Sequence, residues 1–260
     1  YASVAIFLSL WIFRSEASLI LVFLIVFASL PLIYKTLQFE AKKDLFEQDE
    51  WALLGMHFKA LKVFIYLFMG MVVAMAIWYV FLPAEVVYDL FDSQIATIQA
   101  INAGISATGN VTSSWGFLSA IIMNNLKVLI LCVLFSFFYG AGAIFILTWN
   151  ASVISTAIGT FFRTNIAGYA ETVGFMKLAG YFHIFSLGIL RYMTHGVFEI
   201  LAYFIGGLAG GLISIAMLNK KFEGEHFRTV FKDAIDLIIL AVIIIIVAGV
   251  IEVFVTPIMF

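Results

Sequence analysis

Five long apolar runs constrain this chain more than any other feature. They occupy Ala17–Tyr34, Val63–Leu82, Ile121–Thr148, Gly196–Leu218 and Ala234–Val255. A helix needs about 20 apolar residues to cross the hydrocarbon core of a bilayer. Hydrophobic residues make up 64% of the chain and charged residues 12%, whereas a soluble domain is about 45–50% apolar and has no interior that would bury such an excess. The sequence therefore predicts an all-α, polytopic transmembrane helical bundle.

The charge and cysteine content exclude several other classes of protein. Because 14 basic residues stand against 16 acidic ones, for a net charge of −2, the chain has no basic field that would bind nucleic acid. Its single cysteine, Cys132, rules out an intrachain disulfide and a thiolate metal centre. We therefore expect the lipid bilayer as the environment of the chain, with no nucleic-acid partner, no cofactor and no metal ion.

The spans are least clearly marked in the middle of the chain. Between Asn150 and Thr194 the apolar signal breaks into two short stretches, Ala151–Phe162 and Leu178–Tyr192. They represent either one crossing with a re-entrant or interfacial piece, or two helices that lean on other protein. We expect about six spans in all, with one or two short or re-entrant segments.

The distribution of positive charge predicts how the chain crosses the membrane. Lysine and arginine gather in the connections Lys35–Lys62 and Lys220–Lys232, and neither occurs from residue 63 to residue 126. Cytoplasmic connections of membrane proteins carry an excess of these two residues. We therefore expect a multi-pass protein of the cell membrane, with both connections in the cytoplasm and the connection Glu85–Trp115 outside. Residues 1–62 would then hold N-terminal membrane segments and a cytoplasmic helical connection, and 63–260 the main bundle of one structural domain.

The outer connection begins with the pattern of an amphipathic helix. Apolar residues recur at near-helical spacing from Val86 to Ile101, with Glu85, Asp89 and Asp92 between them. Such a helix lies flat on the lipid surface or packs against the bundle. Together with the Gly/Ser/Thr-rich stretch that follows, it could receive a protein partner, and a position flat on the lipid is the equal alternative.

Two carboxylates are predicted to lie at similar depth near the outer boundary of the membrane. Glu199 precedes Leu218, and Glu252 follows Asp233, by 19 residues each, which is about 28 Å along a helix. Three further polar residues open the run Ile121–Thr148 at comparable height: Asn124, Asn125 and Lys127.

Arg191 and His195 extend this polar layer, because they precede Glu199 at intervals of four and share its helix face. Ionisable groups inside a membrane are costly, so they mark candidate functional sites. The layer could hold a metal ion, perform acid–base chemistry or form an ion path. Alternatively, Glu252 pairs with Lys127 or Arg191 in an ion pair that only fixes the packing. We favour the structural role, because groups near the membrane boundary can extend to water or pair with each other. The spacing does not match the zinc-protease pattern HExxH, which counts against a metal site.

Glycines on the helix after His195 predict close helix packing. Gly206 with Gly210, and Gly207 with Gly211, form two pairs at intervals of four. Small residues at this spacing allow helices to approach each other closely in membranes. We expect these faces to pack inside the bundle or across a homo-oligomer.

Three short segments carry a resemblance to a known family. They are Asn124-Asn125-Leu126-Lys127, His195-Gly196-Val197-Phe198-Glu199 and Ile251-Glu252-Val253-Phe254-Val255-Thr256-Pro257. In this order they resemble the stage II sporulation protein M family of integral membrane proteins, over roughly residues 63 to 257. In sporulating bacteria the resemblance implies a membrane scaffold that brings cell-wall-degrading enzymes to the septum during engulfment.

These observations predict a non-enzymatic scaffold that recruits or organises partner proteins at the outer membrane face. The alternative is a transporter or channel that passes a small ion or solute through the polar layer, which would require a polar track continuing inward. A third hypothesis, an intramembrane hydrolase, would require a bound metal ion or an activated nucleophile.

Overall fold

The computed structural model of this chain describes residues 1–43, 50–107, 114–136, 141–166, 175–218 and 225–259. Every regular element within these ranges is a helix, as the sequence predicts. In chain order the elements are α1 (Ala2–Ile12), η1 (Arg14–Glu16), α2 (Ala17–Lys43), α3 (Glu50–Phe81), α4 (Ala84–Ala107), α5 (Ser114–Ser136), α6 (Ala141–Asn165), α7 (Phe175–Leu218), α8 (Glu225–Val250), η3 (Ile251–Val255) and α9 (Thr256–Met259).

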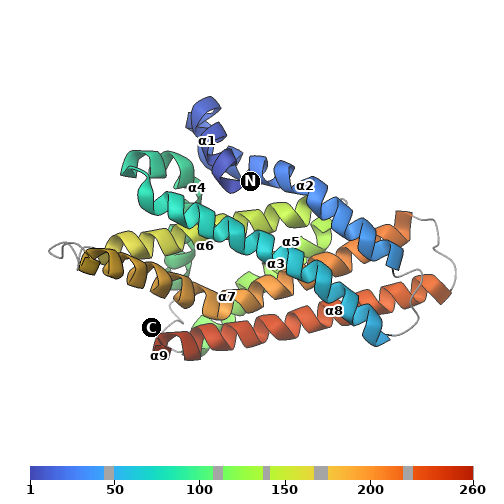
Figure 1. The fold of residues 1–260 in the computed structure, drawn as a ribbon. Coiled ribbons are helices and arrows are strands. Elements are labelled where there is room, and N and C mark those ends of the chain that lie inside the picture. Colours follow the sequence, from blue (N-terminus) through green and yellow to red (C-terminus); the bar gives the residue numbers. More distant parts are fainter. Residues whose placement is uncertain (44–49, 108–113, 137–140, 167–174, 219–224, 260) are drawn as a thin grey trace.

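Six helical stretches of the described residues are long and apolar enough to cross a membrane. They lie in α2, α3, α5, α6 and α7, and in α8 continued by η3 and α9 (Figure 1). The prediction of a transmembrane bundle with about six spans is therefore confirmed. The short apolar helix α1 is not one of these spans, and it packs on α2 and α3.

The run Ile121–Thr148 is not one helix, contrary to the sequence-based prediction. α5 ends at Ser136 and α6 begins at Ala141. The four residues between them in the sequence, Phe-Phe-Tyr-Gly, carry no charge. Hydropathy therefore gives no sign of the break, because the connecting residues are nearly as apolar as the helices on either side.

The two short apolar stretches after Asn150 are parts of full-length helices. Ala151–Phe162 lies within α6, and Leu178–Tyr192 lies within α7, which runs for 44 residues. The second alternative is therefore confirmed, since the stretches belong to two helices that pack against the rest of the protein, and no re-entrant piece is formed by them. Arg163 and Arg191 interrupt the apolar pattern of the sequence, but α6 and α7 continue through them. A charged residue in the pattern therefore does not mark the end of a helix here.

The helices run back and forth between two ends of the bundle (Figure 1). One end holds the end of α2, the start of α3, the end of α7 and the start of α8; we call it the basic end. The opposite end holds α4, the end of α6, the start of α7 and α9. Both connections rich in basic residues thus join helices at the same end, although Lys220 and Lys221 themselves lie outside the described residues. In these two connections, the basic residues whose side chains the structure describes are Lys35, Lys62, Arg228 and Lys232, and all four are exposed.

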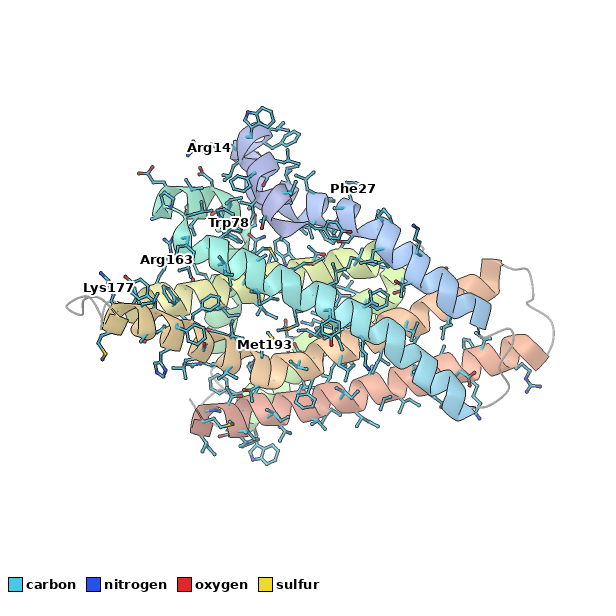
Figure 2. All side chains as sticks on the ribbon, in the orientation of Figure 1. Arg14, Phe27, Trp78, Arg163, Lys177 and Met193 are labelled. Atoms are coloured by element: carbon cyan, nitrogen blue, oxygen red, sulfur yellow. The ribbon has the colours of Figure 1, made fainter. Side chains whose placement is uncertain are left out.

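Polar side chains tie α3 to α6 at the end of the bundle that carries α4. The hydroxyl groups of Tyr79 and Thr160 lie 2.9 Å apart. Arg163, whose position Figure 2 labels, donates hydrogen bonds to the carbonyl oxygens of Tyr79, Val80 and Leu82. These carbonyls close α3, where the helix itself supplies no further N–H donors. Arg163 therefore caps the helix that leads into α4.

The predicted amphipathic helix is α4, and its apolar face packs against the protein. Val87, Leu90 and Phe91 are buried between α2 and α6, so lipid is not needed to cover them. α4 also extends to Ala107, and residues 108–113 of the predicted loop lie outside the described residues. Its polar ties to the bundle are Arg14 Nε to Asp89 Oδ2 (2.8 Å), Ser18 Oγ to Ser93 Oγ (2.8 Å) and Gln94 Nε2 to Ser152 Oγ (3.2 Å).

Two glycines of α7 bring this helix close to α5. A Cβ atom on Gly206 would collide with the side chain of Leu129, and one on Gly210 would collide with the carbonyl oxygen of Val133. A Cβ atom on Gly211 would meet open space. The pair Gly206 and Gly210 therefore packs α7 against α5 within one chain, whereas Gly211 of the second pair does not.

We expect Gly210→Ala to destabilise the protein, because the added methyl group meets backbone that moves only if α5 shifts. Overpacking of this kind typically costs about 1–3 kcal/mol. Gly211→Ala is the matched control, since its methyl group enters open space and alanine is the better helix former by about 1 kcal/mol. Melting temperatures of the two variants in detergent check this contrast, and equal effects would contradict the assigned packing face.

Candidate functional site

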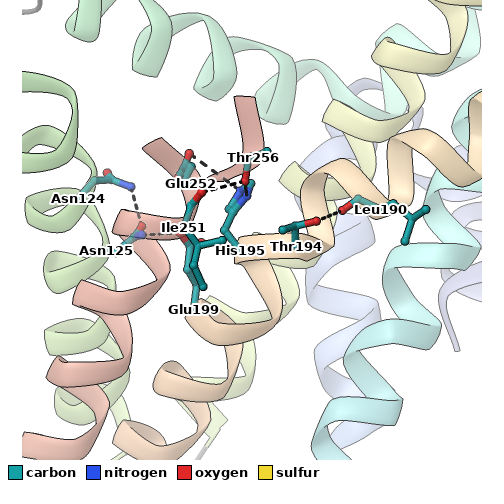
Figure 3. Close-up of polar contacts among 9 residues, drawn as sticks. All are labelled: Asn124, Asn125, Leu190, Thr194, His195, Glu199, Ile251, Glu252 and Thr256. Carbon is teal, nitrogen blue, oxygen red and sulfur yellow. Dashed lines mark hydrogen bonds and ion pairs between the residues drawn. The ribbon is translucent and has the colours of Figure 1, made fainter. Parts of the chain in front are cut away.

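Three helices bring polar side chains together partway along the bundle (Figure 3). α7 contributes His195 and Glu199, α5 contributes Asn125, and the chain after α8 contributes Glu252 and Thr256. We call these five residues the polar cluster. Its members come from segments far apart in the sequence, so only the packing of the helices assembles it.

Short polar contacts join the members of the cluster. Asn125 Nδ2 donates a hydrogen bond to Glu199 Oε1 at 2.6 Å. The carboxyl groups of Glu199 and Glu252 lie within hydrogen-bonding reach of each other. His195 places Nδ1 3.4 Å from Thr256 Oγ1 and Nε2 4.0 Å from Glu252 Oε1. The contacts therefore run from α5 through α7 to the end of α8.

A π-helical turn, η3, presents Glu252 and Thr256 to α7. In such a turn an N–H bonds the carbonyl five residues earlier, and the Thr256 N–H bonds the carbonyl oxygen of Ile251. The Thr256 hydroxyl donates to the same oxygen at 3.2 Å, which leaves its oxygen free to accept from His195 Nδ1–H. Pro257 follows and has no N–H to continue the α-helical ladder. π-helical turns of this kind are frequent at functional sites.

The cluster lies deeper within its helices than the sequence predicts. Asn125 is not at the start of a helix, because α5 begins at Ser114 and ends at Ser136. Eleven residues of α5 therefore separate Asn125 from either end, about 16 Å in each direction. Glu199 has 24 residues of α7 before it and 19 after it. The prediction that Asn125 opens a helix is therefore corrected to a position near the middle of α5, and Glu199 lies near the middle of α7. The depth of these groups in the membrane stays a prediction.

Three residues predicted for this layer do not join the cluster. Lys127 is exposed on α5, and Arg191 lies over the ring of Phe161, 5.5 Å from its centre. Asn124 is exposed and touches the cluster only through a long contact of 3.5 Å to Asn125. The hypothesised ion pair of Glu252 with Lys127 or Arg191 is therefore not formed; the basic group beside Glu252 is His195.

Thr256 was not singled out as a cluster residue from the sequence. The available signal is the Thr-Pro pair at the end of the last apolar run, since a proline there predicts a local break in the helix. That signal marks a bend but does not reveal the partner, because His195 is 61 residues away in the chain.

The composition of the cluster limits its chemistry. Among the described residues, no lysine or arginine contacts either carboxyl group, and no three His, Cys, Asp or Glu side chains are arranged to hold a metal ion. Polar groups in apolar surroundings are stable when their hydrogen bonds are made within the protein. The cluster can therefore fasten α5, α7 and the end of α8 to one another, and it brings ionisable groups into contact inside a span.

We expect Glu199→Ala to lower the melting temperature, because it leaves the amide of Asn125 without its acceptor. Loss of such a buried partner typically costs about 1–3 kcal/mol. Glu199→Gln keeps an oxygen at the acceptor position and should melt close to the wild type. Asp236→Ala, at an exposed acidic residue of α8, is the control for removing a negative charge. Thermal unfolding in detergent checks the order, and an unchanged melting temperature in Glu199→Ala would contradict the fastening role.

Comparison with known proteins adds to this geometry. The model of the family described as stage II sporulation protein M matches residues 63–257. An uncharacterised protein of Methanocaldococcus jannaschii is 29% identical over 142 residues, which cover 53% of this chain and 70% of that protein. No solved structure matches the chain. The region matched by the family model contains the polar cluster and α4.

Proposed function

Because this chain belongs to the stage II sporulation protein M family, we propose that it is a membrane scaffold that recruits partner proteins through α4. The observation that carries the proposal is that α4 packs on the bundle through its apolar face and leaves its polar face exposed. Its apolar face is buried against the bundle, so the helix is held as a fixed part of the fold. A surface held in this way is suited to present side chains to another protein, because little order has to be gained on binding.

The outward face of α4 has the chemistry of a docking surface for a basic partner. Glu85, Tyr88, Asp92 and Gln99 are exposed, and their spacing of three, four and seven residues keeps them on one stripe of the helix. Glu16, exposed in η1 beside α4, adds a further negative charge. Complementary charge guides the approach of a partner and selects among partners.

The basic residues support a particular side of the membrane for α4. Nine of the 14 lysines and arginines belong to the two connections that join helices at the basic end, and five do not. The excess of positive charge supports a cytoplasmic position for that end. α4, at the opposite end, would then face the outside of the cell membrane, where proteins of the cell envelope are found.

The polar cluster has a structural part in this function. It fastens α5 and the end of α8 to α7, and α7 packs against α6, which supports α4. The cluster and α4 thus belong to one connected bundle. No bond is made or broken in this function, in keeping with a non-enzymatic protein.

Substitution of the outward acidic residues of α4 tests the proposal. The double variant Glu85→Gln with Asp92→Lys should lose the proteins that cross-link to the wild type in native membranes, with little change in melting temperature. Gln99→Lys is the matched control, because it places a positive charge on the same stripe without removing an acidic residue. Mass spectrometry of the cross-linked material compares the three proteins. The same partners captured by all three would overturn α4 as the docking surface.

Transport of a small ion or solute is the second candidate function, and the contact between Glu199 and Glu252 favours it. Ionisable groups in contact within a span are the groups through which transporters pass protons and ions. Further along α7 toward the basic end, the next polar side chains are Tyr203 and Ser214, both buried.

Flux measurements in proteoliposomes distinguish transport from scaffolding. If the chain transports protons or monovalent cations, wild-type protein should carry them and Glu199→Gln should not, although we expect that variant to keep the fold. If both proteins are inactive while the wild type still captures partners through α4, the transport candidate is excluded.

A further inference from the structure

The face of α5 that points away from the bundle carries two polar residues where lipid would be expected. Asn124, Lys127, Leu131 and Leu134 are exposed, and their spacing of three, four and three residues forms one stripe along the helix. α5 is among the spans least covered by the rest of the chain. We call these four residues the α5 stripe. A lysine in such a stripe is costly unless it finds a partner.

Lys127 lies too far from either end of α5 to reach water by extending along the helix. It is 13 residues from Ser114 and nine from Ser136, in a helix of 23 residues whose length of about 34 Å is close to that of the hydrocarbon core. Helical side chains lean toward the N-terminus of their helix, and from Lys127 that end is about 20 Å away. The four-carbon stem of a lysine covers only a fraction of this distance.

Within the described residues Lys127 has no acidic partner, yet a carboxylate is partly exposed on the neighbouring element. The Glu252 side chain is 31% exposed beside its contact to His195. η3 packs against α5, and the rings of Trp115 and Phe254 lie 6.0 Å apart there. The surface formed by α5 and η3 thus presents a lysine and a carboxyl group that do not pair with each other within one chain.

The side chains of Lys127 and Glu252 extend toward each other along the direction of the helix axes. α5 and α8 run in opposite directions, and Gly249 of α8 lies against Leu118, Ile121 and Ile122 of α5. Each side chain leans toward the N-terminus of its own helix. Lys127 therefore leans toward the end that carries α4, and Glu252 leans toward the basic end.

We propose that a second copy of this chain packs against the α5 stripe, with Lys127 of each copy facing Glu252 of the other. Twofold symmetry about an axis along the membrane normal keeps each residue at its own depth and forms both contacts at once, as a closed dimer requires. The exposed amide of Asn124 lies in the same layer and adds a hydrogen-bonding group, which favours association of helices in lipid. Because this surface is separate from α4, the dimer does not depend on the scaffold function.

Cysteine cross-linking of the full chain in lipid vesicles tests the dimer. The only cysteine of the chain, Cys132, is buried, so Cys132→Ala provides a background without thiols. Met123→Cys and Leu131→Cys place thiols on the exposed side of α5, and Phe27→Cys places one on the exposed side of α2 as the control. A covalent dimer is expected from at least one α5 variant and not from the α2 variant.

Substitution of Lys127 then tests the charge pairing. In the α5 cysteine variant that cross-links, Lys127→Glu should lower the dimer yield about tenfold, since a tenfold change corresponds to the loss of one modest interaction. Lys127→Met, which suits lipid better and should not disturb folding, separates loss of pairing from repulsion and should also lower the yield. A yield that Lys127→Met leaves unchanged would overturn the proposed pairing.

Two further outcomes would overturn the proposal as a whole. Cross-linking of the α2 variant as readily as the α5 variants would mean that the contacts are random collisions. A wild type that stays monomeric and keeps anionic lipid bound after extraction into detergent, with that lipid lost in Lys127→Met, would show that Lys127 contacts a lipid headgroup instead of a second copy.

Discussion

In the apolar interior of a membrane bundle, a polar side chain has to find its hydrogen-bonding partners within the protein, and this constraint organises the structure around Glu199. Its bond from Asn125 is possible only because α7 approaches α5 closely, and Gly206 and Gly210 allow that approach. The same requirement brings in the last helix, whose π-helical turn carries Glu252 and Thr256 to His195. Helix packing and polar pairing therefore depend on each other.

The same constraint explains how α4 is held. Arg163 satisfies the last carbonyls of α3, so that helix can end where the chain turns into α4. Gln94 and Ser93 then fasten α4 to α6 and α2 through polar contacts beneath its apolar face. The end of the bundle that carries α4 is thus held by polar contacts between helices, and the polar face of α4 points outward. This arrangement is the physical basis for treating α4 as a docking surface.

The candidate site shows where reasoning from spacing succeeds. His195 and Glu199 share one helix face at an interval of four, and the structure places both in the polar cluster. Spacing could not show whether Lys127 and Arg191 join the cluster, because charge pairing depends on how each helix is rotated about its axis. α5 is rotated so that Asn125 faces α7 and Lys127 faces outward, and Arg191 is turned toward Phe161 of α6.

The sequence by itself determined the class of the protein, the approximate number of spans and the polar residues that a membrane bundle must accommodate, because the cost of exposing apolar or burying polar groups is a property of the residues alone. The tertiary structure decided where α5 ends and α6 begins, that α7 is one continuous helix, and which polar residues meet. Those outcomes depend on contacts between residues far apart in the chain. The guanidinium of Arg163 finds its partners at the end of α3, and the π-helical turn before Thr256 brings its hydroxyl group to His195.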